Sequence, residues 1–180
     1  METIFQFWYH HQTDTAMFSL LSFSLAFSTF TTAMIAGLFY SYSCSVNPGL
    51  ARLTDANYIA TMQSINTAII NPVFLFSFLG TLFLLPLSTY LVFQEGISNC
   101  FWLLSGATLL YWTGSFGVTI FGNVPLNEAH ASFDLSTASE HLIAEQRAKF
   151  EQPWNRLHLI RTIASVLSLI LAISACMARK

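Results

Sequence analysis

Long stretches without a charged residue dominate this chain, and each of them predicts helices that cross a membrane. No charge occurs between Asp14 and Arg52, and residues 16–43 exceed the roughly 20 apolar residues that cross a bilayer. A second uncharged stretch separates Asp55 from Glu95. As one helix rising about 1.5 Å per residue, it would be nearly twice as long as a bilayer is thick, so it has to divide.

The predicted point of division is Asn71-Pro72. Proline lacks a backbone N–H and disfavours helix at the residue that precedes it. We therefore expect an amphipathic helix over residues 54–70 and the second membrane span over residues 72–93. A third span is predicted over residues 100–121. The turn that separates it from the second span is short, which implies that the two spans are antiparallel neighbours.

The chain changes character after the third span. Residues 123–156 hold most of its charge and are predicted to form a polar loop, long enough to suggest a function, that contains an amphipathic helix over residues 136–150. The fourth span is predicted over residues 157–177, and Pro153 suits the first turn of that helix.

These elements predict an all-α protein, a four-helix transmembrane bundle with antiparallel, up-down-up-down order. The whole chain, residues 1–180, is expected to form a single membrane domain. The expected location is a bacterial inner membrane or an equivalent membrane, as a multi-pass protein.

Composition agrees with a lipid environment and narrows the set of partners. Charged residues make up 9% of the chain, against roughly 25% in a soluble domain. The mean hydropathy is +0.55, and the 17 phenylalanines suit surfaces that face lipid or pack in a bundle. A net charge of −2 provides no basic stripe for nucleic acid. Membrane lipids, a lipophilic small molecule, and a homo-oligomer or larger membrane complex are the expected partners.

No cofactor is predicted from motifs. The cysteines stand singly at positions 44, 100 and 176, so they form neither a C-x-x-C pair nor a zinc motif. The histidines show no H-x-x-x-H spacing, and no metal site is expected. The sequence leaves a haem, a quinone or a metal recruited between helices open.

A polar stripe marks the start of the fourth span. Trp154, Asn155, His158 and Arg161 follow one another at helical spacing. An arginine inside a span costs at least about 2.5 kcal/mol, so it normally faces the protein interior or a watery cavity. It can also reach back to lipid headgroups. His158 suits a general base, although an ordinary interfacial histidine fits its position equally well.

If Arg161 faces inward, its counter-charge has to come from elsewhere, because the predicted spans contain no acidic residue. The polar loop offers Glu128, Asp134 and Glu151. A bound anionic ligand is the other source of negative charge.

A second polar set consists of Asn66, Asn71, Asn123 and Asn127, with Gln63, all near one membrane face, and Tyr40 and Tyr42 end the first span on that side. Amides can orient a ligand oxygen without the desolvation cost of a charge. They can equally join helices, at about 0.6 kcal/mol per contact, which is the role we expect for Gln63 and Asn66. An aromatic belt at the membrane surface would explain Tyr40 and Tyr42 as well as a ligand site would.

Several short motifs between residues 37 and 166 carry a family resemblance: Gly37-Leu38-Phe39-Tyr40, Asn47-Pro48-Gly49-Leu50, Ile65-Asn66, Asn71-Pro72, Asn123-Val124-Pro125-Leu126-Asn127, Trp154-Asn155 and Arg161. With these motifs the chain resembles the anthrone oxygenase-like family of small four-helix membrane proteins. Fungal members of that family oxidise a polycyclic anthrone to an anthraquinone with molecular oxygen, without a bound metal or flavin.

The resemblance implies a base that removes an acidic C–H proton and donors that hold the resulting enolate. The implied catalytic residues are His158 as the base, with Arg161, Asn155 and Asn127 as donors. The implied substrate-binding residues are Asn66, Asn123, Trp154 and Tyr40.

Two hypotheses follow from the sequence. In one, the protein is an oxygenase that takes a lipophilic aromatic from the bilayer. In the other, it is a non-catalytic accessory or small-molecule-binding subunit that docks on a larger membrane complex through its phenylalanines. The acidic stretch over residues 128–140 departs from the family pattern and leaves the substrate undetermined.

Overall fold

The described part of the chain consists of helices and contains no β-strand. The computed structural model describes the backbone of residues 2–179 and the side chains of residues 20–179. The elements are α1 (Glu2–Ser41), the π-helix η1 (Tyr42–Val46), α2 (Asn47–Leu50), α3 (Asp55–Ala68), α4 (Pro72–Glu95), α5 (Asn99–Leu110), the π-helices η2 (Tyr111–Gly117) and η3 (Thr119–Asn123), α6 (Val124–Ala131) and α7 (Glu140–Ala178). The predicted all-α class is confirmed.

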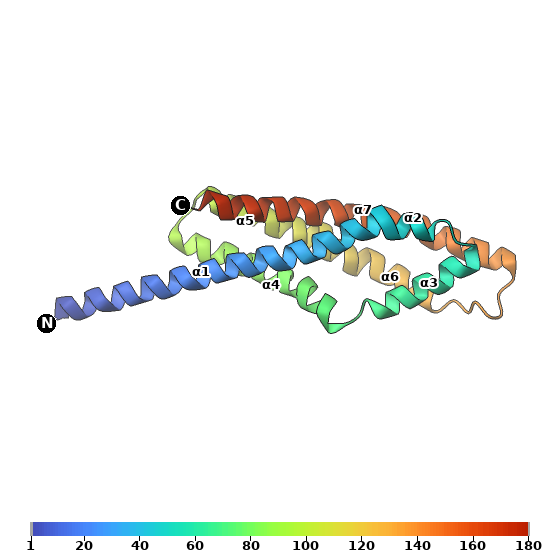
Figure 1. Cartoon of the computed structure of the whole chain (residues 1–180), viewed down its shortest axis with the longest axis horizontal. Coiled ribbons are helices and arrows are strands. Elements are labelled where there is room, and N and C mark those ends of the chain that lie inside the picture. The colour runs from blue at the N-terminus through green and yellow to red at the C-terminus, as the bar shows by residue number, and fades with distance from the viewer. Residues whose placement is uncertain (1, 180) are drawn as a thin grey trace.

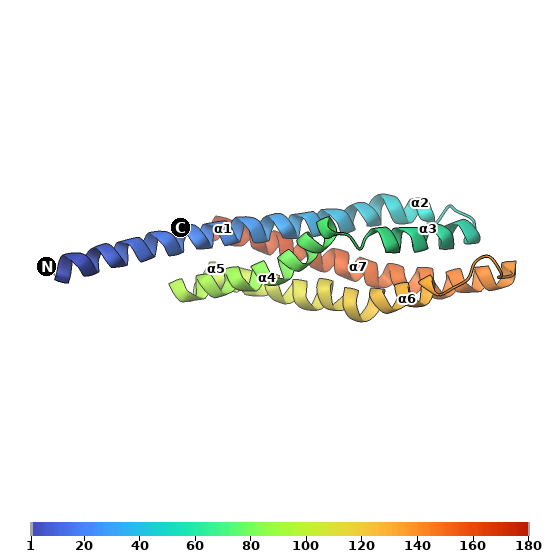
Figure 2. The ribbon, with the colours of Figure 1, turned by 90° about the horizontal axis from the view of Figure 1, so that it is seen from below.

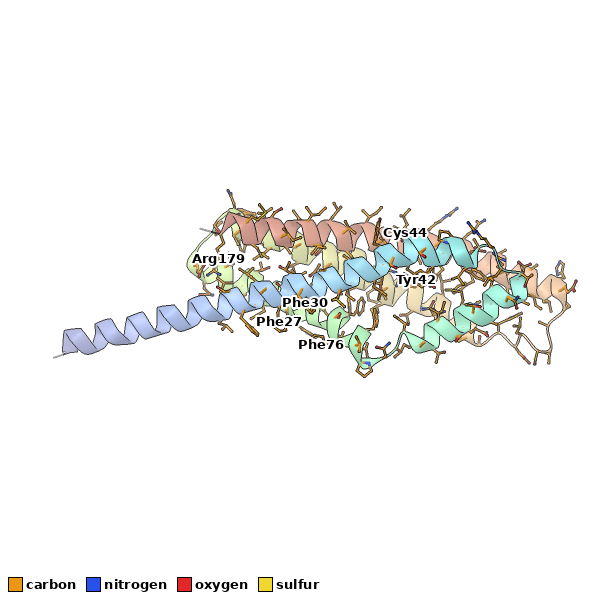
Figure 3. All side chains as sticks on the ribbon, in the orientation of Figure 1. Phe27, Phe30, Tyr42, Cys44, Phe76 and Arg179 are labelled. Carbon is orange, nitrogen blue, oxygen red and sulfur yellow. The ribbon has the colours of Figure 1, made fainter. Side chains whose placement is uncertain are left out.

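Three stretches within the described residues are long and apolar enough to cross a membrane. They are Leu20–Leu50, Pro72–Glu95 and Glu140–Ala178, and they contain most of the first, second and fourth predicted spans. The side chains of residues 16–19, at the start of the first predicted span, lie outside the described part. Apolar rings such as Phe30 and Phe76 are more than half exposed and project outward (Figure 3). The protein is therefore a membrane protein.

The third predicted span, residues 100–121, is helical but is not one uninterrupted α-helix. Helix α5 ends at Leu110, and the chain continues through η2 and η3 into α6. Figures 1 and 2 show this segment running back along α7. Helix α1 packs against α4 and α7, and α5 packs against the same two helices.

The second span begins where the sequence predicted. Asn71 accepts hydrogen bonds from the backbone N–H groups of Val73 and Phe74 at 3.0 Å, so it caps the N-terminus of α4. Pro72 occupies the first turn, where its missing N–H leaves no hydrogen bond unmade. Helix α3 precedes this break and supplies the separate helix that was predicted over residues 54–70.

The prediction of a polar loop over residues 123–156 is wrong. Only residues 132–139 are non-helical, because the end of η3, α6 and nearly the first half of α7 occupy the rest. Helix α7 begins after Ser139, whose hydroxyl accepts a hydrogen bond from the Leu142 N–H, and it passes through Pro153 without ending. Of the predicted helix over residues 136–150, residues 140–150 are part of α7 and residues 136–139 are non-helical, and Pro153 does not start a new helix.

Tertiary contacts explain why α7 extends so far beyond the predicted span. Arg147 donates hydrogen bonds to Asp55 at 2.9 Å, to the Leu53 carbonyl at 2.8 Å and to Glu151 at 2.7 Å. Its guanidinium also lies 4.5 Å from the centre of the Tyr58 ring. These contacts fix the polar end of α7 to the start of α3, and they offset the cost of a proline inside the helix.

Helices η2 and α7 meet closely at Gly114. A Cβ atom added to Gly114 would lie 2.5 Å from the Cβ of Ala164, which is closer than two carbon atoms can approach. Both atoms belong to backbone-anchored positions in packed helices, so neither can rotate away. Glycine is required here for packing, even though it disfavours the helix itself.

Gly114→Ala is therefore expected to lower the melting temperature in detergent, although alanine normally stabilises a helix by about 1 kcal/mol over glycine. Overpacking at this contact should cost about 1–3 kcal/mol. The matched control is the exchange Gly114→Ala with Ala164→Gly, which restores the total volume and should recover most of the loss. A single variant that melts at or above the wild-type temperature would contradict the close contact.

Candidate functional site

A cavity of about 580 Å³ lies at the end of the molecule where α3, α6 and α7 converge with η1. This volume is typical of sites for small organic ligands. Its walls are largely apolar, from Leu38, Phe39, Ile65, Ile69, Ile70, Phe74, Val124, Ala131 and Trp154. Its polar lining consists of Tyr42, Gln63, Asn66, Thr67, Thr119, Asn127, Glu128, His158 and Arg161.

Helical spacing brings these side chains together. Helix α3 contributes positions 63, 66 and 67, and α6 contributes positions 124, 127, 128 and 131. Helix α7 contributes positions 154, 158 and 161. Each set is separated by three or four residues and so lies on one face of its helix. The cavity forms where these three faces turn toward one another.

Arg161 places a buried, positively charged guanidinium in the lining of the cavity. The residue is only 8% exposed, and no carboxylate among the described residues lies within ion-pair distance of it. Its guanidinium carbon lies 4.3 Å from the centre of the Phe39 ring and 5.1 Å from that of Trp154. Arg161 thus faces inward between two aromatic rings and does not reach the lipid headgroups.

The loop carboxylates do not neutralise Arg161. Glu151 pairs with Arg147 at 2.7 Å. Asp134 accepts hydrogen bonds from Ser136 and Thr137, which lower the pKa of its carboxyl group. Glu128 lines the cavity but makes no ion pair with a described residue. The position beside the guanidinium is therefore suited to an anionic ligand atom.

His158 holds the guanidinium in place. Its Nδ1 atom accepts hydrogen bonds from Nε and Nη2 of Arg161 at 3.1 and 3.0 Å. Because guanidinium N–H groups only donate, Nδ1 carries no proton, and the hydrogen-bond pattern assigns the proton to Nε2. Nε2 in turn lies 2.9 Å from the Ser43 hydroxyl. Both ring nitrogens are engaged, so the geometry favours a positioning role for His158 over the predicted role of general base.

Two π-helical turns bring Tyr42 to the site together with two residues, Ser43 and Thr119, that the sequence did not single out. Tyr42 and Ser43 belong to η1, and Thr119 belongs to η3. Tyr42 and Thr119 line the cavity, and the Thr119 hydroxyl lies 3.5 Å from Nη1 of Arg161. A π-turn shifts the register of the following residues and is common at functional sites. Spacing rules for an α-helix therefore could not place these side chains.

Five predicted residues meet in the cavity: Asn66, Asn127, Trp154, His158 and Arg161. Asn127 accepts a hydrogen bond from Nε1 of Trp154 at 2.8 Å, which fixes the edge of the indole ring. The amide nitrogen of Asn66 is buried and has no hydrogen-bond partner among the described residues. An amide N–H without a partner among the described residues can donate a hydrogen bond to a ligand oxygen.

Three predicted site residues lie outside the cavity. Tyr40 is 61% exposed, because a helix turns its neighbours Phe39 and Tyr42 inward and Tyr40 outward. Asn123 is fully buried and donates to the Trp154 carbonyl at 3.3 Å, so it supports the wall instead of lining it. Asn155 is half-buried and does not line the cavity, since it follows Trp154 by one residue and lies on a different face of α7.

Polar contacts join α3 to α6 and to the chain that follows α6, beside the cavity. Gln63 donates hydrogen bonds to the carbonyls of His130 and Phe133 at 3.0 Å, which confirms its predicted role in joining helices. The His130 ring stacks on Phe150 at 3.9 Å and lies 3.3 Å from the Ile59 carbonyl. Burial lowers the pKa of His130, because it disfavours the charged form of the ring.

The fold and the site define a helical membrane protein with a largely apolar cavity whose lining includes the buried guanidinium of Arg161. The chain belongs to the anthrone oxygenase family, whose model matches residues 68–171, more than half of the chain. This match confirms the resemblance seen in the short motifs, and it covers Asn127, Trp154, His158 and Arg161. Neither a curated protein nor a solved structure matches the chain significantly.

Proposed function

We propose that the protein is a membrane-embedded oxygenase that converts a lipophilic, cyclic aromatic ketone of the anthrone type into a quinone with molecular oxygen. The observation that carries this proposal is the buried guanidinium of Arg161, which lacks a carboxylate partner in the described part of the chain and faces an apolar cavity. The family assignment supports oxygenase chemistry.

The cavity suits a substrate that arrives from the bilayer. Its volume of about 580 Å³ and its aromatic and aliphatic walls fit a fused-ring compound. Ile70, at the break between α3 and α4, lines the cavity and is 73% exposed, so an apolar surface leads from the outside of the protein into the site.

The proposed reaction begins with removal of a proton from the acidic methylene group of the ketone. The electron pair moves onto the ketone oxygen, and Arg161 stabilises the enolate that forms. The methylene carbon then donates electrons to O2, and a C–O bond forms. Protonation gives a hydroperoxide, which loses water together with the second methylene hydrogen. One oxygen atom enters the substrate as the new carbonyl, and the other leaves as water.

This reaction needs no electron donor besides the substrate, because the enolate itself reduces O2. The proposal therefore assigns no cofactor to the chain. Asn66 is a second donor in the cavity, and its free amide nitrogen could bind a hydroxyl or carbonyl oxygen on the substrate.

The test is oxygen uptake by the protein in lipid nanodiscs with 1,8-dihydroxyanthrone as the probe. We expect consumption of one O2 per quinone formed, at a rate well above that of empty nanodiscs, which report spontaneous oxidation. With ¹⁸O2, one labelled oxygen should enter each quinone. Binding of the anthrone without faster oxygen uptake would contradict the oxygenase and favour the binding-subunit hypothesis.

We also propose that the chain crosses the membrane four times in antiparallel order, with α5, η2 and η3 as the third crossing. Two observations support this topology. A link over residues 96–98 joins α4 to α5, and the segment that follows α5 returns along α7 to the cavity. On α5 itself, Trp102 is 63% exposed, as expected of a surface that faces lipid.

A further inference from the structure

Glu128 lies on the face of α6 that lines the cavity, together with Val124, Asn127 and Ala131. It supplies the only carboxylate among the described residues of the lining. The residue is exposed, whereas Arg161 is buried, so the two groups lie at different depths of the same cavity.

We propose that Glu128 is the general base that removes the methylene proton from the substrate. This inference rests on the proposed function of the cavity and adds to it the residue that starts the reaction. The proton passes from the substrate carbon to a carboxylate oxygen of Glu128, while the C–H electron pair moves to the ketone oxygen at Arg161. Glu128 then releases the proton to water.

The other titratable groups of the cavity are engaged. The Tyr42 hydroxyl donates to the sulfur of Met62 at 3.2 Å. His158 accepts from Arg161 through Nδ1 and contacts the Ser43 hydroxyl through Nε2. Glu128, in contrast, makes no side-chain hydrogen bond or ion pair with any described residue, so its oxygen lone pairs are free to accept a proton.

The shape of the substrate also requires the base and the group that binds the ketone oxygen to lie apart. In an anthrone, the ketone carbon and the methylene carbon occupy opposite positions of the central ring. A base in contact with the group that binds the ketone oxygen would therefore be at the wrong edge of the ring. His158 lies 3.0 Å from the guanidinium of Arg161, whereas Glu128 comes from a different helix and stands nearer the exposed end of the cavity.

Exposure to water suits this role. A carboxylate at the mouth of a cavity keeps its hydration on one side, so it avoids the desolvation cost of a buried charge. It can also return its proton to bulk water after each turnover. The adjacent residue, Asn127, is held by its hydrogen bond to Trp154, which anchors this turn of α6 against α7.

The experiment measures exchange of the methylene protons of 1,8-dihydroxyanthrone in D2O without oxygen, with the protein in nanodiscs. This step precedes any reaction with O2, so it isolates proton removal. We expect the wild-type protein to accelerate exchange over empty nanodiscs and Glu128→Gln to lose about 10²-fold or more of that acceleration. Glu128→Asp should retain part of it. The control Glu140→Gln removes an exposed carboxylate outside the cavity and should behave as wild type.

The outcomes separate this inference from the proposed function. Accelerated exchange in Glu128→Gln equal to wild type would overturn Glu128 as the base and leave the oxygenase proposal standing. The same holds if the wild-type protein speeds oxygen uptake without speeding exchange. A wild-type protein that accelerates neither process would overturn both. Unchanged melting temperature and unchanged quenching of tryptophan fluorescence by the anthrone should show that Glu128→Gln folds and binds normally.

Discussion

Arg161→Lys is expected to leave the fold intact and to lower turnover of 1,8-dihydroxyanthrone by about 10²–10³-fold, the usual loss when an oxyanion donor is removed. A lysine keeps the positive charge but loses the planar group that packs between Phe39 and Trp154 and donates twice to His158. The measurement is oxygen uptake in nanodiscs, compared with the melting temperature of the same sample.

Arg161→Leu provides the complementary variant. It removes a buried charge that no described carboxylate compensates, and such a charge costs several kcal/mol to desolvate. The variant also leaves the buried acceptor Nδ1 of His158 without its donor, which costs about 1–3 kcal/mol of stability. We therefore expect the melting temperature to be preserved or raised while activity is lost. Full activity in either variant would show that Arg161 takes no part in the reaction.

Trp154→Ala should cause the largest loss of stability, about 3–5 kcal/mol, because it empties the centre of the buried wall. The Trp154 ring stacks on His158 at 5.0 Å and lies 5.4 Å from the Tyr42 ring. Its Nε1–H donates to Asn127 at 2.8 Å, so the variant also frees α6 from α7. Chemical denaturation in mixed micelles, followed by circular dichroism, gives the free energy of unfolding.

The matched control is Trp102→Ala, which removes the same side chain from a position that is 63% exposed. It should change the free energy of unfolding far less, because few protein contacts are lost. Trp154→Phe keeps most of the packing and loses the hydrogen bond to Asn127, so it should cost about 1 kcal/mol. Equal losses in Trp154→Ala and Trp102→Ala would contradict the buried position of Trp154.

The sequence by itself determined the helical class, the membrane environment and the break between α3 and α4. These properties depend on local chemistry: a charge-free stretch favours lipid, and Asn71-Pro72 both ends one helix and caps the next. Helical spacing was also enough to group Trp154, His158 and Arg161 on one face of α7.

Only the tertiary structure decided what those residues contact. The sequence placed Tyr40 in the site, but the register of α1 and the π-turn η1 bring Phe39 and Tyr42 there instead. The sequence also predicted that the fourth helix begins near Pro153, whereas α7 begins at Glu140, because the contacts that hold its first turns are those of Arg147 with residues more than 90 positions away.

The roles of the residues within the site also depend on contacts between helices that are distant in the sequence. The sequence offered His158 as a base and Glu128 as a counter-charge, and both suggestions are chemically sound for isolated residues. Which nitrogen of a histidine is free, and which carboxylate is unpaired, depends on neighbours supplied by other helices. Here Arg161 and Ser43 contact the two ring nitrogens of His158, while Glu128 on α6 lines the cavity without an ion pair to any described residue. Spacing along one helix carries no information about contacts of this kind, which arise only when the helices pack.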